Sequence, residues 1–152
     1  SIQFPDSLKY YTPEGRVVFG GGGIMPDIYI KLRSGNEYVY YNKLINKGLI
    51  YQFSFEYADK HRNELLENYQ TVDSFRSDFI ISDRLFDDFL DYAEEKGVNK
   101  DDEGLNATGE KLKVLLKAFI GRDIFNDIAF YPIYNSSDET YNKAMEVLLN
   151  SQ

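Results

Sequence analysis

The spacing of apolar residues changes near residue 33. Before it, short runs of β-branched and aromatic residues alternate with turn residues, among them Pro13 and four glycines at 20–23. After it, apolar residues recur every three or four positions, which is the period of an amphipathic helix. The pattern predicts an α+β chain, with a short N-terminal β-strand segment at residues 1–35 and a mainly helical domain at residues 36–152.

Three helices are expected in the first half of the helical region. The first covers residues 36–47, and Gly48 ends it because glycine readily adopts the left-handed conformation that follows a helix. The second runs from about Leu49 to Asn68. A short third helix near Val72–Phe79 carries two phenylalanines one turn apart.

Capping residues predict where two further helices begin. Ser82 or Asp83 caps a helix that Gly97 ends, and Thr108 is the expected N-cap of the helix with the strongest apolar stripe. That stripe consists of Leu112, Leu115, Leu116, Phe119 and Ile120.

The C-terminal part of the chain contains a helix stop and a helix start. Pro132 is expected to stop the preceding helix or its continuation, because proline lacks an N–H group. Ser136 and Glu139 have the spacing of a capping box, which predicts a last helix. Its inward residues are Tyr141, Ala144, Met145, Leu148 and Leu149.

The glycine run at 20–23 is unsuited to a helix or a strand interior, because glycine loses the most backbone entropy on folding. It fits a turn or a close backbone contact. A phosphate-binding loop is the alternative, but no Gly-Lys-Ser/Thr follows, and Pro26 and Asp27 lead to a β-prone run rather than to a helix. The structural interpretation is therefore favoured.

The residues on both sides of the glycine run resemble a known enzyme family. Residues 2–30, and within them the runs 4–13 and 15–28, are similar to the end of the catalytic domain of carboxy-terminal processing peptidases, the S41 serine peptidases, in which a YYTPxGR strand leads to GxGIxPD. Further matches to the FxYxDxHR segment of family members from Bacteroides-like bacteria are Phe55, Tyr57, Asp59, His61 and Arg62.

The resemblance implies a hydrolase, a serine endopeptidase of the periplasm or cell envelope that acts on protein or peptide substrates. In the family, the nucleophilic serine and the general-base lysine lie upstream of the strand in which this chain begins. Lys9 is the nearest lysine, but it belongs to the matched strand and is not assigned as the base. The resemblance thus implies an inactive C-terminal fragment, in which no catalytic, cofactor-binding or metal-binding residue is assigned.

Composition excludes several function classes. The 17 basic and 25 acidic residues give a formal net charge of −8, which disfavours nucleic acid and anionic membrane surfaces as partners. The absence of cysteine excludes disulfides, a thiolate zinc site and a cysteine nucleophile. No apolar run is long enough to insert directly into a membrane as a spanning helix.

An acidic segment has the spacing of an EF-hand calcium loop. The residues at its ligand and glycine positions are Asn99, Asp101, Glu103, Gly104 and Glu110. Asn99 replaces the usual aspartate at the first position, and polar Asn106 stands where the loop normally has an apolar residue. A solvated acidic loop is favoured, and calcium binding stays open as the alternative.

The only histidine, His61, cannot form a zinc site without cysteines or a group of carboxylates. Residues 59–62 are interpreted as an ion-paired helix face rather than a catalytic one. A second charged group is expected on the solvated side of the helix that follows Ser82, and it comprises Asp87, Asp88, Asp91, Glu94 and Glu95.

Two functions remain open. The favoured one is the C-terminal portion of an S41-type endopeptidase, whose helical tail packs on the catalytic core, shapes substrate approach or mediates assembly. The alternative is a non-catalytic helical protein-interaction module with a β-strand arm that docks by strand addition. In both cases, the open edges of the N-terminal strands are expected to cause self-association.

Overall fold

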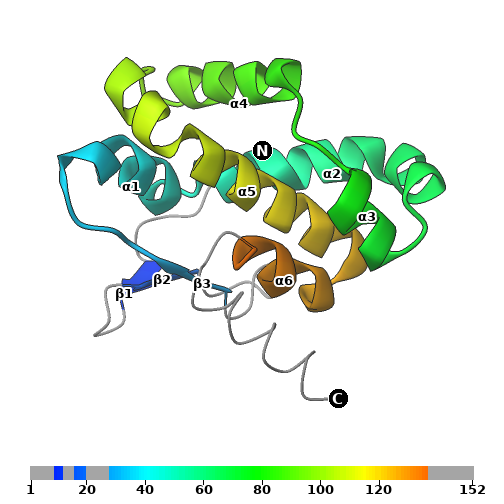
Figure 1. Cartoon of the computed structure of the whole chain (residues 1–152). Helices are drawn as coiled ribbons and strands as arrows, with labels where there is room; N and C mark the ends of the chain where they lie inside the picture. The colour runs from blue at the N-terminus through cyan, green and yellow to red at the C-terminus, as the bar shows by residue number, and fades with distance from the viewer. Residues whose placement is uncertain (1–8, 12–15, 20–27, 137–152) are drawn as a thin grey trace.

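The computed structural model describes residues 9–11, 16–19 and 28–136, and most of these are helical (Figure 1). In chain order the described elements are β1 (Lys9–Tyr11), β2 (Arg16–Phe19), β3 (Ile28–Lys31), the short 3-10 helix η2 (Asn36–Tyr38), α1 (Val39–Asn46), α2 (Leu49–Asn68), α3 (Val72–Asp78), α4 (Asp83–Glu95), α5 (Asp102–Phe125), the 3-10 helix η3 (Asp127–Ala129) and α6 (Phe130–Tyr134). The mainly helical character predicted for the larger part of the chain is confirmed over these residues.

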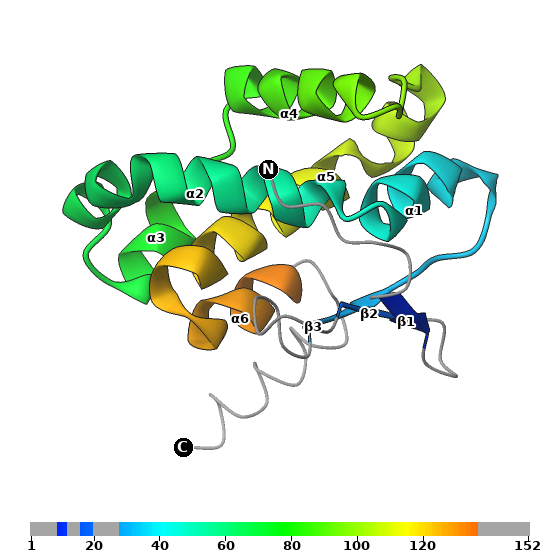
Figure 2. The same cartoon turned by 180° about the vertical axis from the view of Figure 1, so that it is seen from behind.

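α5 lies at the centre of the helical domain. Its predicted apolar stripe is buried, with no member more than 1% exposed. α2 packs against it (Figure 2), and the rings of Tyr51 and Phe119 meet edge to face with their centroids 5.7 Å apart. α4 lies on one side of α5, and α6 lies on the other side. The core is therefore built around one long helix that other helices cover.

The three short strands pair antiparallel in the order β1-β2-β3, with Tyr10 opposite Val18 and Val17 opposite Ile30. They lie on the same side of α5 as α6 (Figures 1 and 2). Ile28 and Ile30 are 2% and 1% exposed and belong to the same buried cluster as the helices. Two residues apart on a strand, they share one face. β3 is thus packed into the helical core.

β3 also has a polar contact with the helices. The backbone N–H of Lys31 donates a hydrogen bond to the hydroxyl of Tyr134 in α6, at 3.2 Å. The segment after β3 is held by Asn42 of α1, whose side-chain amide bonds both the N–H and the carbonyl oxygen of Arg33, at 3.2 and 2.6 Å. The division of the chain at residue 35 remains a prediction, and these hydrogen bonds join residues before it to residues after it.

Several predicted helix ends are confirmed. Gly48 has φ 70° between α1 and α2, in the left-handed region that glycine tolerates best. Ser82 is the residue that caps α4, because its hydroxyl accepts the N–H of Leu85 at 3.1 Å. Gly97, with φ 97°, follows the end of that helix. These ends follow from local residue chemistry, which a sequence displays directly.

The predicted N-cap of the longest helix is wrong. α5 begins at Asp102, and the carboxylate of Asp101 caps it by accepting the N–H of Gly104 at 3.3 Å. Thr108 lies inside the helix, where its hydroxyl donates to the carbonyl of Gly104 at 2.6 Å. The first turns of α5 pack closely on Tyr40 at Gly104, where an added Cβ atom would lie 2.6 Å from the Tyr40 Cβ.

The predicted stop at Pro132 is also wrong in its location. α5 ends at Phe125, where Asn126 adopts φ 70°, and Pro132 lies inside the short helix α6. Proline is tolerated there because the N–H groups of a first helical turn have no intrahelical partner. The glycine run at 20–23 lies outside the described residues, and so does Glu139 with the predicted last helix.

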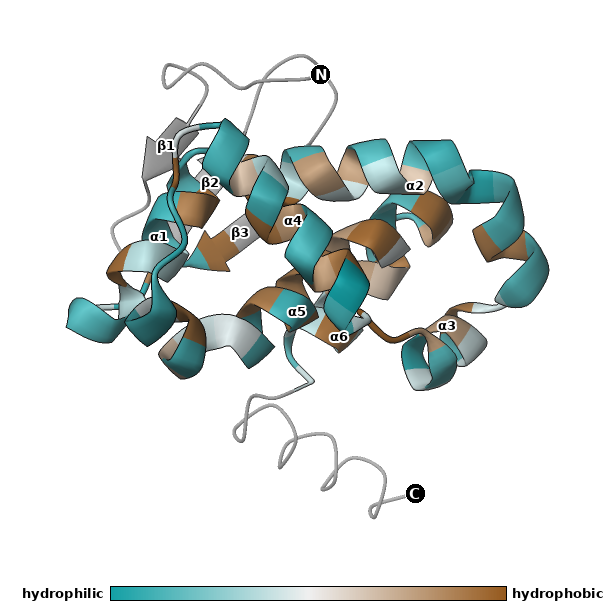
Figure 3. Cartoon of the chain, turned by 90° about the horizontal axis from the view of Figure 1, so that it is seen from above, coloured by the Kyte–Doolittle hydropathy of each residue, from teal (hydrophilic) through white to brown (hydrophobic). Residues whose placement is uncertain are grey.

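The acidic side chains of α4 are exposed as predicted, and Figure 3 shows a mainly hydrophilic outer surface on this helix. The apolar side of α4 is buried, with Phe89 and Ala93 at 0% exposure. Over the described residues, no helix combines the length and the apolar character needed to cross a bilayer.

Candidate functional site

A hollow of about 370 Å³ lies where α3, α5 and α6 meet, and we call it the α3–α5–α6 groove. It is lined by Asp73, Arg76, Ser77, Val114, Lys117, Pro132, Ile133 and Ser136. Three of these side chains are charged, two carry hydroxyl groups and three are apolar, so the hollow can contact both polar and apolar groups of a ligand.

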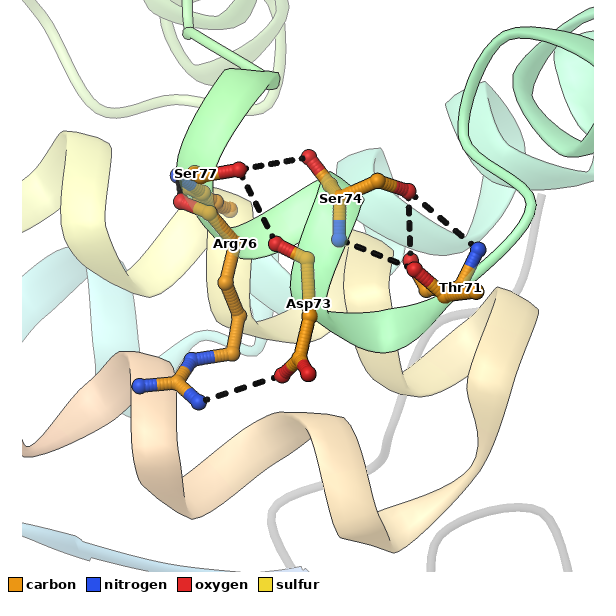
Figure 4. Close-up of polar contacts among 6 residues, drawn as sticks. Thr71, Asp73, Ser74, Arg76 and Ser77 are labelled. Carbon is orange, nitrogen blue, oxygen red and sulfur yellow. Dashed lines mark hydrogen bonds and ion pairs between the residues drawn. The ribbon is translucent and has the colours of Figure 1, made fainter.

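α3 presents polar side chains to this groove, and a capping box fixes its N-terminus. The hydroxyl of Thr71 accepts the N–H of Ser74 at 3.1 Å, and the hydroxyl of Ser74 accepts the N–H of Thr71 at 3.2 Å. On the inner side, the buried ring of Phe75 stacks on Phe79 with centroids 4.7 Å apart. Figure 4 shows the side chains of Asp73 and Arg76 projecting from the same side of the helix.

Two cationic side chains meet in the α3–α5–α6 groove. The ammonium of Lys117 donates to the backbone carbonyl of Arg76 at 2.6 Å. The guanidinium of Arg76 lies 3.7 Å from the carboxylate of Asp73, which is a long ion pair. Burial lowers the pKa of Lys117, and the neighbouring charge of Arg76 lowers it further. The lining therefore carries more positive than negative charge, in a chain whose net charge is negative.

A second hollow, of about 250 Å³, lies between α2 and α4. Its lining comprises Phe53, Glu56, Tyr57, Lys60, His61, Leu85, Asp88 and Tyr92. The rings of Phe53 and Tyr92 pack edge to face at 5.4 Å, and the Tyr92 hydroxyl donates to the buried side chain of Gln52 at 3.2 Å. This hollow is more aromatic than the first, and its charges are mixed.

His61 lies at a kink in α2, since its φ of −109° and ψ of 15° depart from helical values. Its ring packs on Tyr57 with centroids 4.4 Å apart, and its Nδ1 lies 3.3 Å from a carboxylate oxygen of Glu64. Arg62, the next residue, instead reaches α5 and donates to the backbone carbonyl of Asp123 at 3.0 Å. His61 thus contacts Glu64 on the predicted face, a contact that is an ion pair only when the imidazole is protonated, whereas Arg62 connects two helices.

Asp123 is a site that the sequence did not reveal. Its Oδ2 is buried and has no hydrogen-bond partner within the described part of the chain. Burial raises the pKa of Asp123 to about 7, although the charges of Arg122 and Arg62 oppose the shift. Arg122 is engaged elsewhere, because its Nε donates to Asp127 at 2.9 Å. Asp123 is thus a carboxyl group that stays protonated at a pH well above the usual range for aspartate.

The EF-hand alternative loses its geometry in the structure. Residues from Asp102 onward are helical, so the segment from Asn99 to Glu110 does not form a continuous loop, and Asp101 serves as a helix cap. Among residues 28–136 and the two described strands before them, no group of three or more histidine or carboxylate side chains is placed to hold a metal ion.

The residues matched to the FxYxDxHR segment do not converge on one point. Tyr57 and His61 line the α2–α4 hollow, whereas Arg62 contacts α5. The ring of Phe55 stacks on that of Tyr51, with the ring centroids 6.3 Å apart. Their spacing therefore reflects how α2 packs against its neighbours on two sides.

Comparison with known proteins gives one family match. The model of the family of unknown function DUF8443 matches residues 40–126, which is more than half of the 152-residue chain. The matched region starts in α1 and ends directly after α5. Neither a curated protein nor a solved structure matches the chain.

Proposed function

Because the chain belongs to DUF8443, a family of unknown function, we propose its role from its own residues: it is the C-terminal portion of an S41-type serine endopeptidase. In this proposal the helical domain is non-catalytic. The Ser–Lys dyad that cleaves peptide bonds is supplied by residues upstream of Ser1, in a periplasmic or cell-envelope enzyme.

The resemblance of residues 2–30 to the end of the S41 catalytic domain carries the proposal, and the burial of Ile28 and Ile30 in the helical core supports a rigid connection between the helical domain and that part of the chain. These residues end the block that resembles the last strands of the peptidase domain. A flexible connection would leave them exposed, whereas in this fold they share a core with α2 and α5. A helical domain joined in this way keeps a fixed orientation relative to the sheet that precedes it.

A fixed orientation gives the helical domain a role in the reaction without chemistry of its own. A domain held at a constant position beside an active site restricts the direction from which a polypeptide substrate enters. The α3–α5–α6 groove and the α2–α4 hollow are the surfaces of the helical domain that could contact such a substrate. The substrates in this proposal are proteins or peptides.

The test compares the longer natural protein with residues 1–152 alone, each incubated with an unfolded protein and followed by mass spectrometry. We expect cleavage by the longer protein, loss of cleavage when its upstream nucleophilic serine is changed to alanine, and no cleavage by residues 1–152. Hydrolysis by residues 1–152 alone, or a longer protein without a serine and lysine upstream, would contradict the proposal.

The second candidate is a non-catalytic interaction module that uses strand addition, and the described sheet favours it in one respect. In the order β1-β2-β3, β1 is an edge strand, and an open edge can pair with another chain. This candidate includes self-association through the N-terminal strands. Light scattering on residues 1–152 should then show a dimer or larger assembly that becomes monomeric when residues 1–27 are deleted. That deletion keeps Ile28 and Ile30, so the helical core stays complete.

A further inference from the structure

We infer that residues 137–152 of the same chain bind in the α3–α5–α6 groove. Ser136, the last described residue, is itself part of the groove lining, so the segment that follows starts at the edge of the hollow. A segment tethered at the edge of a site has a high effective concentration there. This inference does not depend on the peptidase proposal.

The sequence of residues 137–152 fits the apolar part of the groove. Five apolar residues are spaced so that they share one side of a helix, namely Tyr141, Ala144, Met145, Leu148 and Leu149. Val114 and Pro132 in the groove are only half-buried, and Ile133 lies beside them. An apolar stripe gains free energy when such side chains cover it, because both surfaces leave water.

The charges of the two surfaces are complementary. Residues 137–152 contain three carboxylates, on Asp138, Glu139 and Glu146, and one lysine. The groove lining contains Arg76 and Lys117 against the single carboxylate of Asp73. An acidic segment would also offset the charge of Arg76, which lowers the pKa of Lys117 in addition to the larger effect of burial. A basic segment would gain nothing from this arrangement.

Hydrogen exchange measured by mass spectrometry tests the inference on the full chain. We expect the backbone amides of residues 141–149 to exchange at least about tenfold more slowly in the chain than in a synthetic peptide of residues 137–152, because an isolated helix of that length is marginal in water. Exchange at the rate of the free peptide would overturn the inference.

Two arginine variants identify the surface. Arg76→Glu reverses a charge in the groove, and we expect it to remove most of the protection. Arg84→Glu is the matched control, because Arg84 is exposed on α4 and lies outside the groove lining. Adding Glu139→Lys to Arg76→Glu should restore protection in part. Equal protection in the wild type and in Arg76→Glu would overturn the assignment to this groove.

The occupant is identified by dilution. Binding within one chain is independent of concentration, so the protection should be the same after a hundredfold dilution. Protection that disappears on dilution, together with a dimer in light scattering, would mean that a second copy supplies the segment, and the inference as stated would be wrong.

Discussion

Replacing both Ile28 and Ile30 by alanine should destabilise the helices, although neither residue lies in one. Each isoleucine is almost completely buried, at 2% and 1% exposure, in the cluster that also contains Leu44 and Phe119. Large-to-small changes at such sites cost about 2–5 kcal/mol each, because the lost burial and the remaining cavity both count. Even with partial relaxation around two neighbouring sites, we expect a loss of about 4 kcal/mol or more.

This loss is large relative to the stability of a domain, which is about 5–15 kcal/mol. The assay is urea unfolding followed by far-UV circular dichroism, a signal that comes almost entirely from the helices. With a denaturant dependence of about 1–3 kcal/mol/M, the midpoint should fall by roughly 2 M. The matched control is Val39→Ala, since Val39 is 56% exposed and its change should stay within about 0.5 kcal/mol.

An unchanged midpoint in the double variant would refute the reasoning, because the strand would then contribute nothing to the helical core.

The same logic applies to a chain that begins at Arg33. The sequence pattern suggests that such a chain is an autonomous helical domain. However, a start at Arg33 removes Ile28 and Ile30, which are core side chains in the structure. We expect it to be destabilised to a similar extent.

Four further substitutions test separate parts of the account. Burial raises the pKa of Asp123 from 3.8 to about 7, so the free energy of unfolding is highest below about pH 4, where the carboxyl is protonated, and falls as the pH rises through 7. Asp123→Asn should remove this dependence and be more stable than the wild type at pH 8 by roughly 2–4 kcal/mol. Gly121→Ala should lower the free energy of unfolding by about 1–3 kcal/mol, because the new Cβ would lie 2.9 Å from a ring carbon of Phe75. Gly109→Ala should raise it by about 0.5–1 kcal/mol, because a Cβ there meets no atom within 4 Å and alanine favours the helix. Asp101→Ala should cost about 1 kcal/mol through loss of the α5 cap. Urea titrations measure all of them; a flat pH profile for the wild type, equal effects of the two glycine changes, or a neutral Asp101→Ala would contradict the respective arguments.

Local signals allowed much of the helical domain to be predicted. The positions of Gly48, Ser82 and Gly97 follow from residue types that favour helix ends, and the stripe of α5 follows from its spacing. The start of α5 was predicted too late in the chain, because its first turns lack the apolar stripe: Asp101 is a favoured N-cap type, but the packing of Gly104 on Tyr40 cannot be inferred from local pattern. Propensity and periodicity do not report such contacts.

The candidate sites depend on residues far apart in the chain. In the α3–α5–α6 groove, Lys117 donates to the carbonyl of Arg76, and no sequence pattern brings these two residues together. Asp123 stands between Arg122 and Ile124, and no local feature of the sequence distinguishes it, because its burial results from packing. The isoleucines of β3 were predicted as strand residues, but their packing on helices was not.

The most direct test of the central claim is native-state hydrogen exchange of β3 compared with α5. If Ile28–Lys31 belongs to the helical core, its backbone amides and those of Leu112–Ile120 should open with free energies that agree to within about 2 kcal/mol and fall together with added urea. Amides in β3 that exchange with a free energy of opening near zero, while α5 remains protected, would contradict the claim that the strand is fixed to the helical domain.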